Sequence, residues 1–311
     1  MKKYIVFAIV FFSLMMESQT FDIVPLGIYG GEEEDNLSSY LISKHNTNRF
    51  LALDAGTINA GIKKSIEKGT FSVSRDVVLK DYIKAYFISH GHLDHISGLI
   101  INSPADSKKN VYAIPFVQDI IKKHYFINDT WANFTDEGVA PIGKYTLKNL
   151  DTQSYTEIPE TGLKIKAFEL SHTKDYKSSA VLVNHNNQYV LYFGDTGADR
   201  IEESKDLEIL WKSIAELIKK NSLKAILIEV SFPNNQPEKF LFGHLTPNLL
   251  NEEFSKLAKL ASKEKMKNFK VIVTHRKPTG NNPEIIKKEL LQNNSLELNY
   301  IFPVQGEKLS F

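Results

Sequence analysis

The 311-residue chain contains no cysteine, which excludes disulfide bonds, cysteine-ligated zinc, a thiol nucleophile and a lipid-modified cysteine anchor. Arginine is nearly as scarce: it occurs only at positions 49, 75, 200 and 276, so lysine carries most of the positive charge. Net charge is also nearly absent, because 38 Lys and Arg against 37 Asp and Glu leave +1 at pH 7. Such a balance creates no general attraction to nucleic acid or to acidic membrane, and we expect neither as a partner.

Long apolar runs are absent except at the start of the chain. Lys2 and Lys3 precede a run over residues 4–16 that only Ser13 interrupts. A basic start followed by 13 such residues is typical of a secretory signal, and the run is shorter than the roughly 20 residues of a membrane-spanning helix. We therefore expect a signal peptide over residues 1–18, an exported protein in the periplasm or medium, and a mature domain over residues 19–311. An uncleaved anchor or a buried first strand is the alternative, since Met16 is an unusual residue near a cleavage site.

What is present is an ordinary globular composition, 42% hydrophobic and 24% charged. Hydrophobic periodicity predicts helices over residues 115–135, 204–220, 247–262 and 283–292. Apolar or alternating runs predict strands over 22–28, 38–43, 50–53, 83–88, 111–114, 164–170, 179–184, 189–193, 224–229, 270–274 and 298–302. No linker divides the chain. The order of elements favours a single α/β domain of two packed sheets with helices on both outer faces.

The strongest chemical signal is the segment His90-Gly91-His92-Leu93-Asp94-His95, directly after the strand predicted at 83–88. Imidazole and carboxylate are good ligands for zinc and similar ions. Alternate residues of an extended loop can converge on one ion, while Asp94 and His95 beyond the bend can reach a second.

Three further polar residues repeat this placement downstream. His172, Asp195 and His275 each follow a predicted strand. Binding groups gathered at the carboxyl ends of strands are typical of a site on an open sheet. Asp195 is the natural bridge, because one carboxylate can bind two cations.

These residues resemble the metallo-β-lactamase superfamily. Residues 90–105, HGHLDHISGLIINSPA, are similar to the signature of its class II cyclic-nucleotide phosphodiesterases. Four shorter segments resemble the same family: 50–56, 229–234, 243–247 and 274–278. The resemblance covers about residues 22–311, and the signal-like start is similar to exported bacterial members. It implies the αββα sandwich of the superfamily.

The resemblance also implies two metal sites. His90, His92 and His172 would form one, and Asp94, His95 and His275 the other, with Asp195 bridging them. Zinc is the expected metal, with Mn²⁺ or Fe²⁺ as alternatives. Asp54 would orient a ligand from behind, although a plain turn residue explains it equally well.

His244 could donate a proton, contact the substrate phosphate or only cap a loop, and the resemblance favours a catalytic or substrate-binding role. Together with Asp94 it completes the expected catalytic residues. Ser231 and Asn234 could contact the nucleotide or only form a turn, and Lys277 could offset phosphate charge or be a solvated cation. His45, His124 and His185 are expected at the surface. Four aromatic residues are expected in the core rather than against a purine: Tyr125, Trp131, Phe232 and Phe242.

Together these observations predict a binuclear hydrolase of 3′,5′-cyclic nucleotides, with cAMP converted to 5′-AMP. The alternatives are a lactonase, a β-lactamase or an RNA 3′-processing nuclease of the same superfamily. A nuclease would be expected to carry a basic surface, and the nearly neutral net charge of this chain argues against that activity. A non-catalytic, metal-dependent nucleotide-binding protein is the remaining possibility. The oligomeric state is open, with a dimer among the options.

Overall fold

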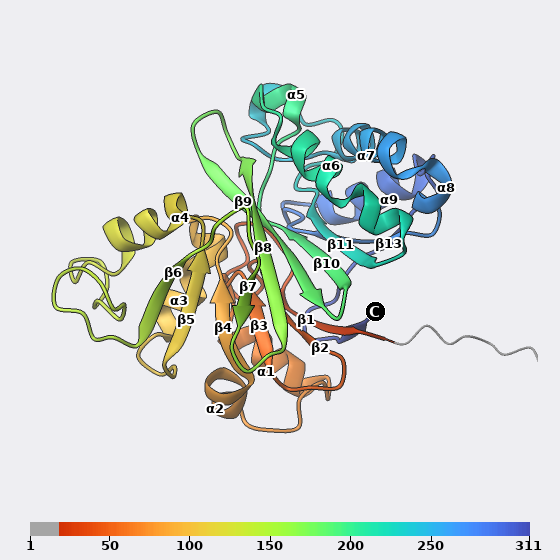
Figure 1. Ribbon diagram of the computed structural model, residues 1–311. Coiled ribbons are helices and arrows are strands. Elements are labelled where there is room, and N and C mark those ends of the chain that lie inside the picture. Colours follow the sequence, from red (N-terminus) through yellow and green to blue (C-terminus); the bar gives the residue numbers. More distant parts are fainter. Residues whose placement is uncertain (1–18) are drawn as a thin grey trace, which may run out of the picture.

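The computed structural model describes residues 19–311 as two seven-stranded sheets packed face to face (Figure 1). The predicted signal segment lies outside the described residues. The first sheet has the order β14-β1-β2-β3-β4-β5-β6 and the second the order β13-β12-β11-β10-β9-β8-β7. The strands of the first sheet are β1 (Phe21–Gly27), β2 (Ser39–Lys44), β3 (Phe50–Leu53), β4 (Ile83–Phe87), β5 (Lys109–Ala113), β6 (Tyr145–Asn149) and β14 (Leu309–Ser310). Those of the second are β7 (Thr156–Ile158), β8 (Leu163–Ser171), β9 (Lys177–His185), β10 (Gln188–Phe193), β11 (Leu223–Glu229), β12 (Lys270–Thr274) and β13 (Asn299–Ile301).

Helices cover both outer faces of this sandwich, and in Figure 1 α6 and α7 lie at the upper right while α1 and α2 lie at the bottom. The longer helices are α1 (Asn59–Glu67), α3 (Leu93–Asn102), α6 (Asp206–Lys219), α7 (Pro247–Ala261) and α9 (Asn282–Gln292). The shorter ones are α2 (Arg75–Val77), η1 (Val78–Tyr82), α4 (Pro115–Ile120), η2 (Ile121–Tyr125), α5 (Asp199–Glu202), η3 (Glu238–Phe240) and α8 (Lys263–Met266). No helix among residues 19–311 is long and apolar enough to cross a membrane.

The second sheet is apolar on both faces because each face meets a different layer. Successive side chains of a strand point to opposite faces. In β10, Val190 and Tyr192 join the core between the sheets, whereas Leu191 and Phe193 join the core under α6 and α7. This pattern explains why the central strands read as continuous apolar runs rather than as alternating ones.

The predicted fold class is confirmed, and each predicted strand corresponds to an observed one. Strands β6, β7 and β14 were not predicted. The helix expected over residues 115–135 is wrong beyond Tyr125, where η2 ends. Asn128 and Asn133 accept backbone N–H bonds there, from Asn133 and Thr135, and such side-chain bonds compete with helix formation.

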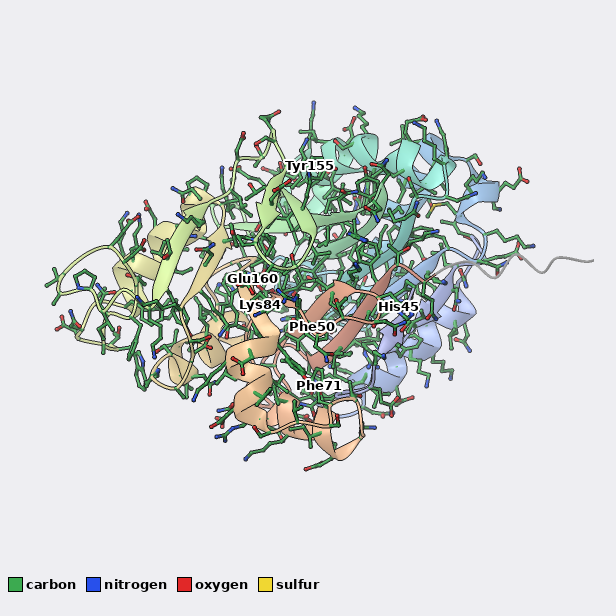
Figure 2. The ribbon with its side chains drawn as sticks, turned by 60° about the horizontal axis from the view of Figure 1, so that its bottom comes forward. His45, Phe50, Phe71, Lys84, Tyr155 and Glu160 are labelled. Atoms are coloured by element: carbon green, nitrogen blue, oxygen red, sulfur yellow. The ribbon has the colours of Figure 1, made fainter. Side chains whose placement is uncertain are left out.

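The carboxyl ends of β8, β10, β11 and β12 lie at one edge of the second sheet, since β10, β11 and β12 are parallel and β8 is antiparallel to β9, which is antiparallel to β10. At the amino-terminal ends of β3 and β4, Phe50 packs edge-on against Phe71, with ring centroids 5.8 Å apart (Figure 2). Lys84 of β4 pairs there with Glu160 of the β7–β8 turn at 3.0 Å, a contact between the two sheets. The polar residues that carry chemistry gather at the opposite, carboxyl ends.

Candidate metal centre

The first four candidate ligands come from the connection between β4 and α3. His90 and His92 lie on the extended segment after β4, whereas Asp94 and His95 lie in the first turn of α3, which begins at Leu93. The extended half and the helical half direct their side chains differently, so one short segment serves two groups of ligands. The bend was expected from the sequence, but the helix that begins there was not.

The other three candidates come from the second sheet. His172 directly follows β8, Asp195 lies two residues after the end of β10, and His275 directly follows β12. Their side chains are buried, as are those of His90 and His95. The packing of the two sheets brings all seven predicted residues to one place.

The seven residues form two groups whose potential ligand atoms lie within 4.8 Å of one another: His90, His92, His172 and Asp195; and Asp94, His95, Asp195 and His275. In the first, His92 Nδ1 lies 3.2 Å from the Nε2 atoms of both His90 and His172. In the second, His275 Nε2 lies 3.1 Å from Asp94 Oδ2 and 3.3 Å from Asp195 Oδ2. Asp195 belongs to both groups.

Some buried polar atoms of this cluster have no hydrogen-bond partner, which is consistent with a site for divalent cations. His95 Nε2 and Asp195 Oδ1 are buried and form no hydrogen bond with any group of residues 19–311, although they lie 3.3 Å apart. Buried polar atoms without a partner are rare and call for an explanation such as an ion. Five imidazoles and two carboxylates suit zinc and neighbouring transition metals. Burial lowers the pKa of His172 to about 4 and holds the pKa of His90 well below its usual value, which favours the neutral imidazole that binds metals.

Asp54 supports the second group from behind. Its side chain is fully buried and accepts a hydrogen bond of 2.7 Å from His95 Nδ1. Tyr192 and Ser89 donate to the same carboxylate at 2.6 and 2.7 Å. Asp54 therefore does more than form a turn: it fixes the ring of His95 with Nε2 toward the cluster.

His244 lies beside both groups. Its ring is 4.9 Å from that of His172 and 5.2 Å from that of His275, centroid to centroid. His244 Nδ1 lies 2.8 Å from Glu229 Oε1. Burial lowers the pKa of His244 to about 4, and the positive charge of Lys277 acts in the same direction.

Glu229 is one of two residues of the site that the sequence did not predict. Its buried carboxylate ends β11 and also accepts hydrogen bonds from Ser231 Oγ at 2.7 Å and from the Thr196 amide at 3.2 Å. Ser231 has one hydroxyl proton, which Glu229 accepts, so His275 Nδ1 donates to Ser231 across 2.9 Å. Glu229 thus orients His244 directly and His275 through Ser231.

Tyr176 is a second missed residue. Its ring stacks on that of His92 at 4.6 Å, and its hydroxyl accepts the amide hydrogen of Gly91. Tyr125 donates to the carbonyl oxygen of the same glycine. The two tyrosines fix the segment that carries His90 and His92, and no sequence pattern marked them for this role.

The remaining residues considered from the sequence lie elsewhere or serve the fold. Asn234 accepts from the Asn248 amide at the start of α7, which supports the turn interpretation. His124 is exposed, while His45 and His185 are half-buried. The aromatic residues Tyr125, Trp131 and Phe232 are partly buried. The core assignment is wrong for Phe242, which is 63% exposed.

Comparisons with known proteins agree with this geometry. Residues 20–301 match the model of the class-II cAMP phosphodiesterases. The chain belongs to the class-II cAMP phosphodiesterase family. This family member is 39% identical to a 3′,5′-cyclic-nucleotide phosphodiesterase of Aliivibrio fischeri, a match that covers 96% of each chain. It is 38% identical to a probable 3′,5′-cyclic-nucleotide phosphodiesterase of Yersinia pestis, over 96% of this chain and 92% of that one.

Solved structures confirm the fold of this phosphodiesterase-family chain. Unliganded yeast PDE1 matches with a TM-score of 0.84 at 24% identity, over 94% of this chain and 100% of that one. The metallo-β-lactamase fold protein YhfI from Bacillus subtilis matches with a TM-score of 0.59 at 15% identity, over 93% and 99%. The predicted family and sandwich fold are both confirmed.

Proposed function

We propose that this chain hydrolyses 3′,5′-cyclic nucleotides, cAMP in particular, to the 5′-monophosphate at a pair of divalent metal ions. One observation carries the proposal: two groups of imidazole and carboxylate ligands share Asp195 in a chain of the class-II cAMP phosphodiesterase family. The paired arrangement suits phosphodiester hydrolysis, in which both the attacking and the leaving oxygen need stabilisation.

The proposed ligands are those that the sequence indicated. His90, His92 and His172 would hold one ion, and Asp94, His95 and His275 the other, with Asp195 shared. Zinc is the metal that we propose for both. When bound, the two ions supply Lewis-acid chemistry and offset the charge of the phosphate.

Hydrolysis adds the oxygen of water to phosphorus and breaks the bond from phosphorus to the 3′ oxygen, which then needs a proton. His244 is the protein group placed to handle it. Because Nδ1 is hydrogen-bonded to Glu229, Nε2 is the ring nitrogen left to exchange a proton or to contact the phosphate. Burial favours the neutral ring, and the carboxylate of Glu229 opposes this effect by stabilising the protonated form.

A substrate panel tests the proposal. Zinc-loaded protein is assayed against cAMP, cGMP, a lactone, a β-lactam and an RNA 3′-extended substrate, with products identified and zinc measured by elemental analysis. We expect 5′-monophosphate from the cyclic nucleotides and two zinc ions per chain. Faster turnover of the lactone, the β-lactam or the RNA would instead assign the chain to another activity of the fold.

We also propose export with cleavage after Ser18, which rests on the Lys2-Lys3 start and the apolar run over residues 4–16. Amino-terminal sequencing of protein recovered from the native host tests it. Intact protein beginning at Met1 and held in the cytoplasm would contradict export.

A further inference from the structure

Lys277 is a cation beside the metal centre that has no carboxylate partner. It follows His275 by two residues, is half-buried, and forms no salt bridge within residues 19–311. Glu32, which is close in space, instead accepts a hydrogen bond from Thr279. Half-burial removes part of the water around the amine, and an anion bound beside it would replace that solvation.

Neighbouring groups place the Lys277 amine at the edge of the two ligand groups. A Cβ built on Gly31 would lie 3.7 Å from Lys277 Nζ, and the amide of that glycine donates to Asp94 Oδ2 at 2.9 Å. On its other side Nζ lies 5.7 Å from the centre of the Phe232 ring. Phe232 in turn packs edge-on against His244, with ring centroids 5.7 Å apart. The amine therefore lies between a ligand of one ion and the proposed proton-handling histidine.

Charge decides what the amine can bind there. Four carboxylates surround the cluster, those of Asp54, Asp94, Asp195 and Glu229, and two divalent ions would balance their charge. Lys277 adds one further positive charge, which a bound anion would offset. The anion that the proposed function brings to this place is a phosphoryl group, and its charge increases when a diester becomes a monoester.

We propose that Lys277 binds the phosphoryl group at the metal centre, and that it holds the monoester product and the charge developing toward it more strongly than the diester substrate. This role rests on the proposed function. An ammonium group suits it as a compact point charge with three N–H donors. The Phe232 ring, 5.7 Å from Nζ, helps to hold the amine in place by a cation–π contact.

Binding of inorganic phosphate and of 5′-AMP to zinc-loaded protein, measured by calorimetry, tests this role. In Lys277→Met we expect both dissociation constants to rise about 10- to 100-fold, the loss of one charge-assisted hydrogen bond. The kcat for cAMP should fall more than KM rises. Lys277→Arg should retain most of the binding. The chain offers a matched control: Lys239 lies over the Phe240 ring at 4.7 Å on the exposed η3, so Lys239→Met removes a similar cation–aromatic contact and should change neither constant.

The outcomes separate the two proposals. If the wild-type protein binds phosphate but hydrolyses no cyclic nucleotide, the proposed function fails, while the phosphate measurements still decide on Lys277. If Lys277→Met binds phosphate as the wild type does, or if the wild type binds none, the role of Lys277 is wrong. Lys277→Gln is measured in parallel in case the methionine variant does not fold. Loss of zinc in a folded variant would show that Lys277 supports the metal centre instead, which also overturns the proposal.

Discussion

Single hydrogen bonds determine which ring nitrogen each candidate ligand presents. His95 Nδ1 contacts Asp54, His172 Nδ1 contacts the carbonyl oxygen of Gly243 at 2.9 Å, and His275 Nδ1 contacts Ser231. Each of these bonds leaves Nε2 for the cluster. His92 is the exception, because it presents Nδ1 and lacks such a bond, so Tyr176 holds its ring by stacking instead. Such outer contacts typically change metal affinity or activity by about 10- to 100-fold.

His244 and His92 should respond differently to truncation. His244→Ala should retain both ions and the fold but lose about 10²- to 10⁴-fold in kcat, the usual contribution of a general acid or base. His92→Ala should lose metal and activity together. Zinc stoichiometry and kcat of both variants provide the comparison. Wild-type turnover by His244→Ala, or loss of zinc from it, would contradict the role assigned to His244.

Glu229→Gln should disturb the site although Glu229 is not one of the seven proposed ligands. Glu229 accepts from His244, Ser231 and the Thr196 amide, and a glutamine has one acceptor oxygen where the carboxylate has two. At least one donor is left unpaired, which costs about 1–3 kcal/mol of unfolding free energy. We expect kcat for cAMP to fall while two zinc ions remain bound. Urea unfolding measures the loss of stability, and elemental analysis measures the zinc content. A variant with unchanged stability and kcat would show that the carboxylate does not orient His244.

At the scale of elements, the segment after β1 limits how His275 is placed. Gly30 packs directly against the His275 ring: a Cβ on Gly30 would lie 2.1 Å from Cε1 of that ring. His275 itself has a positive φ of 54°, which few non-glycine residues adopt, so its ring has little freedom to yield. The exit of β1 and the end of β12 therefore fit together only with a glycine at this position.

Gly30→Ala should consequently displace the His275 ring and weaken the second metal group. We expect the variant to hold less zinc than the wild type and to lose most of its activity. Gly69→Ala is the control, since a Cβ at Gly69 meets no atom within 4 Å and only its positive φ of 76° is strained. Dialysis against graded zinc concentrations checks the difference. Equal zinc retention by both variants would show that the loop adapts.

The sequence predicted most of the elements and all seven residues of the cluster, because both follow from local pattern. Polar residues directly after apolar strands predicted the ligands. Glu229 is the last residue of the strand predicted at 224–229, but its contact with His244 comes from a loop 15 residues further along the chain. Helix α3 was not predicted, because its first turn contains the metal ligands Asp94 and His95 and the segment was interpreted as a loop. The hydrogen bond from Tyr192 to Asp54 could not be predicted, because the apolar sequence of β10 does not indicate which residues of the other sheet face it.

At the scale of the whole molecule, β14 closes the first sheet beside β1, and Asp22 ties this edge together. Its buried carboxylate accepts from Ser310 at 2.7 Å, from His45 at 2.8 Å and from the Asn46 amide at 2.9 Å. Burial alone would raise the pKa of Asp22, but these hydrogen bonds and the charge of Lys308 outweigh it and hold the pKa below its usual value. Asp22 therefore stabilises the packing of β14 and of the turn after β2 against β1 most strongly when it is ionised.

A lowered pKa gives a defined pH dependence. The contribution of Asp22 is complete above the unfolded-state pKa of about 3.9 and is lost as the pH falls through the lower folded-state pKa. At pH 7, Asp22→Asn should lower the free energy of unfolding by about 1–3 kcal/mol. The difference from the wild type should narrow below about pH 4, as measured by urea unfolding across pH. Asp129→Asn, on an exposed loop, is the control and should leave the free energy of unfolding unchanged across this pH range. If the stability lost in Asp22→Asn stayed constant down to acid pH, ionisation of Asp22 would not be its cause.

The origin of the candidate ligands has a consequence for how the molecule comes apart. Four of them follow β4 of the first sheet, and three follow strands of the second sheet. Each bound ion would therefore cross-link the two sheets at their interface. A ligand that binds only the assembled state adds to the free energy of unfolding by mass action, about 2.7 kcal/mol at a concentration 100 times its dissociation constant. The concentration of free metal would then set part of the free energy of unfolding of the whole sandwich. Removal of the metal by a chelator would first weaken the contact between the two sheets at the metal centre.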